Sequence, residues 1–299
     1  MSRRNDRFAT LTTAFATVLL LAGSTAASAQ DVAVTAGVDV RMATGTFGTD
    51  ETTHLVYAPA VIRVRIDRFE LSGYFPYVSI DNGTVTFSQG GFLPMRGALP
   101  GNPNSGVMMG SSGGMHGGVG ADAGLPGSTS FGSMAVRGGL GDVAIGAGYR
   151  VVDDSLAGLE VVLSTRVKIP TASADRGLGT GRTDIAGLAT VRRQFTRGWI
   201  YVEAGYVYVG KLDGVGLSNA ALWGVGAGRQ LTRSVYLIAS AAGNTAVLRE
   251  FGAPVELGAG LGLRLGERAV LSVLPGVGLT DASPRYVLSI GIRSDLLRR

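Results

Sequence analysis

The fold is most evident in residues 159–169, which read LEVVLSTRVKI. Apolar side chains and one threonine occupy the odd positions, while Glu160, Ser164, Arg166 and Lys168 occupy even positions. Successive side chains of a β-strand point to opposite faces, so this alternation predicts a strand with one apolar face and one polar face. Such a strand is typical of a sheet with one face in an apolar environment and the other in a polar one.

The same alternation recurs in residues 143–151, 255–265 and 286–293, and no window after Gln30 has an amphipathic helical period. It predicts about twelve strands, whose boundaries are uncertain by ~2–4 residues. The expected strands are 31–43, 53–66, 69–81, 139–152, 157–170, 183–195, 199–211, 219–231, 235–246, 254–265, 269–280 and 285–295.

The connections between these strands alternate in length. Tight turns, such as Asp67-Arg68, alternate with longer loops, of which residues 83–138 are the longest. Together with the long strands, this rhythm predicts an all-β fold, an antiparallel up-and-down transmembrane β-barrel of about 12 strands. The 83–138 insertion is then a long Gly/Met-rich external loop. The alternative fold is an exported soluble β-sandwich, whose strands would alternate in the same way.

Composition excludes several kinds of chemistry. The chain has 299 residues with 47 glycines, no cysteine and two histidines, His54 and His116. Glycine disfavours helices, and the lack of cysteine excludes a disulfide framework, a thiolate zinc site and a cysteine nucleophile. A Met/His group at 108–116 is a weak Cu(I) alternative, because its spacing has no repeat. We therefore expect no catalytic residue, no metal site, no cofactor and no enzymatic activity.

The N-terminal segment predicts export. Residues 1–29 have the pattern of a signal peptide: Arg3, Arg4 and Arg7, an apolar stretch at 8–22, and a small-x-small cleavage site at 27–29. Residues 30–299 would form the barrel in the cell outer membrane, with membrane lipid and the outer-membrane assembly machinery as partners. Removal of residues 1–29 takes three arginines and one aspartate and lowers the net charge from +5 to +3. The remaining basic residues are scattered and almost all arginine, so nucleic acid is not an expected partner.

Charged residues recur on the strand face opposite the apolar one, and we expect them to line the barrel lumen. They are Arg65, Glu70, Arg150, Glu160, Arg166, Lys168, Asp184, Arg192, Glu203, Glu256 and Arg264. Tight turns centred on their polar residues would place Arg65 opposite Glu70, Arg150 opposite Glu160, and Arg192 opposite Glu203. The looser 171–182 connection would oppose Lys168 to Asp184 and Glu160 to Arg192. Opposite charges in these positions attract. The expected result is a transverse ladder, Arg150–Glu160–Arg192–Glu203, that stiffens the wall or filters solutes.

One stretch resembles a known family. Residues 168–173 read KIPTAS, residues 177–181 read GLGTG, and Asp184 follows; residues 141–143 and 148–150 also fit the pattern. They resemble the outer-membrane transporter-like family named for the meta-pathway of phenol degradation. Ala172 stands where that family usually has glycine. The resemblance implies passage of small hydrophobic or aromatic compounds across the outer membrane.

The function expected from these observations is a channel for passive passage of a small-molecule solute. Twelve strands lie between the eight whose lumen side chains fill and the sixteen or more of open porins, so a narrow lumen is expected. The 83–138 loop would fold back as a constriction or plug. The alternative is a non-transporting structural or adhesive barrel that displays this loop.

Overall fold

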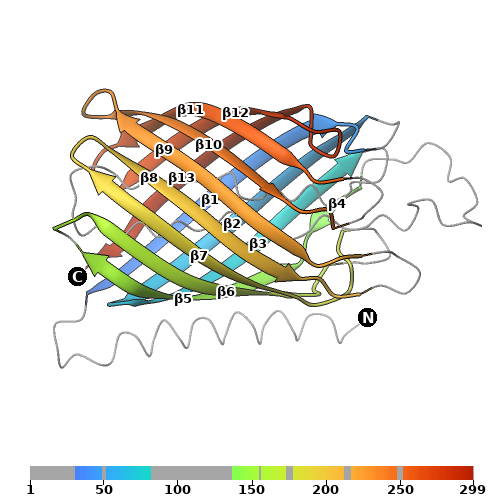
Figure 1. Ribbon diagram of the computed structural model, residues 1–299, viewed down its shortest axis with the longest axis horizontal. Helices are drawn as coiled ribbons and strands as arrows, with labels where there is room; N and C mark the ends of the chain where they lie inside the picture. Colours follow the sequence, from blue (N-terminus) through green and yellow to red (C-terminus); the bar gives the residue numbers. More distant parts are fainter. Residues whose placement is uncertain are drawn as a thin grey trace, which may run out of the picture.

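The computed structural model of the chain describes residues 31–48, 52–81, 137–154, 156–172, 178–211, 217–247 and 252–298, and these form a closed antiparallel β-barrel (Figure 1). Its strands are β1 (Val32–Gly45), β2 (Thr53–Ile66), β3 (Phe69–Asp81), β4 (Arg137–Leu140), β5 (Val143–Asp154), β6 (Leu159–Ile169), β7 (Asp184–Phe195), β8 (Gly198–Tyr208), β9 (Ala220–Gln230), β10 (Val235–Asn244), β11 (Val255–Leu265), β12 (Ala269–Gly278) and β13 (Tyr286–Arg298).

The barrel closes because β1 pairs with both β2 and β13. Every other strand pairs antiparallel with its neighbours in sequence, except that β3 pairs with β4 and with β5. The tight turns lie at the end of the barrel that carries the C-terminus, at the left in Figure 1, and the longer connections lie at the other end. We call these the turn end and the loop end. The predicted up-and-down barrel is confirmed.

The expected strand 139–152 is wrong in one respect, because it is interrupted. β4 and β5 are separated by Gly141 and Asp142, and the pairing with β3 shifts by one residue across this break. Gly141 N–H donates to the carbonyl of Pro76 at 2.9 Å. Asp142 turns inward and is 2% exposed. The break therefore brings a carboxylate into the barrel interior.

The outer face of the barrel is apolar. Exposed large side chains alternate with buried ones along the strands, as with Ile185 and Val191 on β7 and Leu261 and Leu263 on β11. Most exposed aromatic residues lie near the two ends, although Phe75 lies midway along β3. Those near the loop end are Tyr77, Tyr206, Tyr208, Trp223 and Tyr286, and those near the turn end are Phe69, Tyr149 and Phe195. An apolar belt between two aromatic girdles is the surface that a transmembrane barrel presents to lipid. Within the described ranges, no helix is long and apolar enough to cross a bilayer.

Close strand packing depends on one glycine in the wall. A Cβ on Gly260 of β11 would overlap the carbonyl oxygen of Val273 and lie 2.8 Å from Cα of Leu274. All of these atoms belong to the backbone of β12, so no side chain can move aside. The β11–β12 pairing is already interrupted here, between Gly258↔Gly276 and Leu261↔Val273, next to a proline that cannot donate to the ladder.

We expect Gly260→Ala to prevent β11 and β12 from pairing and to reduce the yield of folded barrel sharply. The matched control is Gly187→Ala on β7, because nothing lies within 4 Å of a Cβ at that position. The measurement is refolding into detergent micelles, followed by the heat-modifiable shift on a gel. Equal folded yields for the two variants would contradict the close approach of β11 and β12.

Candidate functional site

The barrel interior changes character along its axis. Charged side chains lie along the whole interior, with Arg65, Arg150 and Arg192 toward the turn end and Lys168, Asp184 and Glu256 near the loop end. Buried apolar side chains form two clusters toward the loop end and a third on β8, β10 and β12, which includes Trp199 and Tyr236. A solute that entered from the loop end would therefore first meet apolar side chains held beside buried ion pairs.

The first apolar group, which we call the mouth cluster, lies at the loop end on the β1–β3 and β13 side. It consists of Ala43, Phe47, Leu55, Val78, Ile80, Leu178 and Val287. Leu178 comes from the β6–β7 connection and Phe47 from the β1–β2 connection, and they are 2% and 0% exposed. Two connections thus fold inward and narrow the mouth. Phe47 has φ 51°, a left-handed conformation that costs of order 1–3 kcal/mol and is retained only where surrounding packing holds it.

A buried lysine positions the β6–β7 connection. Lys168 is fully buried, and its Nζ lies 2.8 Å from Asp184 Oδ2 and 3.3 Å from Asp142 Oδ2. Nζ also donates to Thr180 Oγ1 at 2.8 Å. We call Lys168, Asp142, Asp184 and Thr180 the anchor group. The predicted opposition of Lys168 and Asp184 is confirmed by the β6–β7 register.

The anchor group also holds backbone on both sides of it. Ala172 N–H donates to Asp142 Oδ1, and Gly210 N–H donates to Asp184 Oδ1, both at 2.9 Å. A Cβ on Gly179 would lie 2.7 Å from the Asp142 carboxylate, so only glycine fits this close approach. The residues that carry the family resemblance are therefore those that fix the connection bearing Leu178.

The second apolar group lies on the opposite wall, over β7–β10. It consists of Ala186, Leu188, Val207, Val209, Leu217, Ala220, Leu222, Ala242 and Val247. Val209, Leu217 and Val247 lie beyond the strand ends, in loop-end connections. Lys211 Nζ donates to the Leu217 carbonyl at 2.6 Å, which helps to hold that connection. The apolar zone therefore continues around the loop end.

Ion pairs cross-link the interior. Arg41 Nη2 of β1 donates to both carboxylate oxygens of Glu256 of β11, at 2.8 and 2.5 Å, although β13 and β12 lie between their strands in the sheet. Arg63 Nε lies 3.8 Å from Glu70 Oε1. Arg166 stacks on the Tyr74 ring, 4.4 Å from its centroid, and donates to its hydroxyl at 3.2 Å. Such pairs, with both partners present, favour one arrangement of the lumen side chains.

The eleven charged residues expected in the lumen all lie on the strand face opposite the lipid-facing side chains. Eight of them are buried, Arg65, Arg150, Arg166, Lys168, Asp184, Arg192, Glu203 and Glu256, and three are half-buried, Glu70, Glu160 and Arg264. Some of the predicted opposite positions are confirmed and others are wrong. Arg65 lies opposite Glu70, and Glu160 lies opposite Arg192, as expected. However, the ion pair of Arg65 is with Asp31, at 3.2 Å.

The predicted four-membered ladder is wrong at two of its steps. The β7–β8 turn consists of Thr196 and Arg197, one position earlier than expected, and pairs Phe195 with Gly198. Glu203 therefore lies opposite Thr190 and accepts a hydrogen bond from its hydroxyl at 2.8 Å. Arg192 lies opposite Tyr201 instead. A bulge between Arg150 and Val152 moves Glu160 opposite Asp153. Arg150 nevertheless reaches both carboxylates, with Nε 3.6 Å from Glu160.

Several interior residues were not among the sequence predictions. Arg41 shares the polar face of its strand with Asp39, so its alternation could have identified it. Asp142, Phe47 and Leu178 lie in interruptions or connections, where no periodicity indicates which way a side chain points. Residues 83–136 of the predicted 83–138 loop, with its Met/His group, lie outside the described residues, and the last two residues of that loop begin β4 instead. Within the described residues, no group of three or more metal-binding side chains occurs.

Comparison with known proteins gives a fold and no family. No protein-family model matches the chain, and no curated protein matches it. An outer-membrane channel from Pseudomonas putida F1 is similar in structure, with a TM-score of 0.59 at 11% identity over 88% of this chain and 95% of that one. The KdgM porin in complex with disordered oligogalacturonate has a TM-score of 0.49 at 6% identity, over 87% of this chain and 99% of that one. The CymD monoaromatic hydrocarbon channel has a TM-score of 0.42 at 10% identity, over 89% of each chain.

Proposed function

We propose that this protein is an outer-membrane channel that lets small apolar or aromatic compounds pass passively. The observation that carries the proposal is the mouth cluster, an apolar constriction that two connections form at the loop end of the barrel. Residues 1–29 would direct export and be removed, and the assembly machinery of the outer membrane would insert residues 30–299. The resemblance to the meta-pathway family supports the same solute class.

Passage would depend on the partition of the solute from water into the mouth cluster and on its displacement of side chains there. An apolar solute that enters the mouth exchanges water contacts for contacts with Phe47 and Leu178, which is favourable by the hydrophobic effect. It can take the place of the Leu178 side chain in the mouth cluster while the anchor group holds the connection in place. The ion pairs below remain formed throughout. We propose no covalent step and no enzymatic role.

The proposal is tested by ion currents through the purified full-length protein in planar bilayers. We expect small currents that phenol reduces in a concentration-dependent way, because phenol occupies the mouth cluster, while sucrose at the same concentration has no such effect. Absence of any current, both in the wild type and after mutation of the mouth cluster, would favour the structural or adhesive barrel instead.

A further inference from the structure

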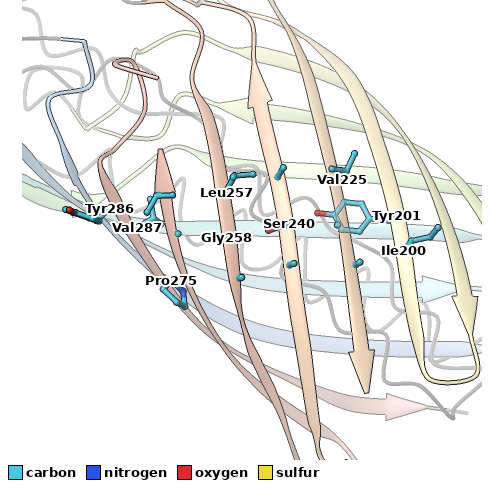
Figure 2. Close-up of a pocket in the computed structure, with 16 residues that line it drawn as sticks. Ile200, Tyr201, Val225, Ser240, Leu257, Gly258, Pro275, Tyr286 and Val287 are labelled. Atoms are coloured by element: carbon cyan, nitrogen blue, oxygen red, sulfur yellow. The ribbon is translucent and has the colours of Figure 1, made fainter. Parts of the chain in front are cut away.

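A groove lies on the lipid-facing side of the barrel wall. Its volume is about 970 Å³, and it crosses β8 to β13 (Figure 2). Its lining is almost entirely apolar and includes Val225, Leu257, Pro275, Val277 and Tyr286. Four of these five residues are also among the exposed large hydrophobic side chains of the chain. The groove is therefore a feature of the membrane-facing surface, and it shares one lining residue, Val287, with the mouth cluster.

The groove exists because small side chains meet in register. Ala227 lies opposite Ala239, and Ala239 lies opposite Ala259, so these exposed alanines form a shallow row across three strands. A neighbouring row has larger side chains that project further from the wall, with Leu257 opposite Val277 and Val277 opposite Tyr286. Strands are about 4.8 Å apart, so a row across β8–β13 runs on the order of 20 Å. The result is a long, narrow trough.

The shape of the trough favours one occupant. Two barrels of this kind are convex, and when they pack side by side they touch along a line, so a second copy would leave the row of alanines unfilled. An acyl chain is narrow, flexible and apolar, and the groove is continuous with a surface that already faces lipid. Filling it with hydrocarbon recovers dispersion contacts that an empty trough loses.

A cation stands at one end of the trough. Arg285 is exposed at the loop end, and its guanidinium carbon lies 5.6 Å from the centroid of the Tyr286 ring, which lines the groove. Tyr286 belongs to the aromatic girdle, the level at which lipid headgroups lie. Guanidinium groups bind phosphate with paired, directional hydrogen bonds. We propose that the groove binds an anionic, phosphate-bearing membrane lipid, with one acyl chain along Ala227, Ala239 and Ala259 and the phosphate at Arg285.

The test is native mass spectrometry of the full chain in detergent, titrated with dipalmitoyl phosphatidylglycerol or dipalmitoyl phosphatidylcholine. One Arg–headgroup interaction of about 1 kcal/mol corresponds to roughly fivefold tighter binding of the anionic lipid. Arg285→Gln should remove that preference. Ala239→Phe should fill the trough and reduce retention of both lipids. Ala147→Phe, at an exposed outward position on β5, is the matched control and should bind lipid as the wild type does.

Both phenylalanine variants place an apolar side chain against lipid, so they should fold, and a heat-modifiable gel shift checks that they do. Equal retention of the two lipids by the wild type would overturn the proposal. So would unchanged retention by folded Ala239→Phe protein. A dimer that Ala239→Phe abolishes would show that the groove is a protomer interface and would overturn the proposal too.

Discussion

Replacing Lys168 with methionine is expected to lower the free energy of unfolding of the barrel by about 3–5 kcal/mol, the cost of removing one partner from a buried ion pair. Methionine keeps most of the side-chain volume, so the loss is that of the ammonium group. Asp142 and Asp184 would be left buried beside each other without the cation that lies 3.3 and 2.8 Å from them. The measurement is the folded fraction against urea concentration in detergent.

Lys211→Met is the matched control, because Lys211 also lies at the loop end but is exposed. Its loss removes one hydrogen bond, to the Leu217 carbonyl, and should cost about 1 kcal/mol, well below the cost at Lys168. A second variant, Lys168→Met combined with Asp184→Asn, removes a carboxylate together with the cation and should recover part of the lost stability. Identical urea midpoints for wild type and Lys168→Met would show that the anchor group does not hold the fold.

The second large effect is expected on the ion current through the barrel after a substitution in the mouth cluster. Leu178→Ser removes the side chain that the β6–β7 connection contributes to the mouth cluster. Burying a leucine side chain stabilises by about 1.5–3 kcal/mol, so its loss should shift the equilibrium toward the open mouth roughly tenfold to a hundredfold. We expect the time-averaged conductance to rise, and block by phenol to weaken, in planar bilayers.

Leu156→Ser is the control for this experiment, since Leu156 is fully exposed beside the β5–β6 turn at the other end of the barrel. It makes the same chemical change without touching the mouth. If Leu178→Ser and Leu156→Ser both conduct as the wild type does, the mouth cluster is not the barrier to flow.

The strand pattern could be predicted from sequence because lipid on one side and a polar interior on the other impose period two on every strand. For the same reason Lys168, Asp184 and Glu256 could be placed on the inner face. Register was less predictable, since a shift of one residue in the β7–β8 turn moves Glu203 from Arg192 to Thr190 without any change in alternation.

Long-range contacts were beyond sequence reasoning. Arg41 and Glu256 are far apart in the chain, and only closure of the barrel brings them to 2.5 Å. The inward fold of Leu178 depends on Gly179 approaching the Asp142 carboxylate, a contact that no local pattern encodes.

The most direct test of a gated mouth uses the absence of cysteine from the chain. A Phe47→Cys/Leu178→Cys variant carries the only two thiols, which a cleavable bis-maleimide can link across the mouth. We predict that linked barrels, still folded by gel mobility, lose their single-channel currents, and that cleavage of the linker restores them. Linked barrels that conduct at the unlinked level would contradict passage through this mouth.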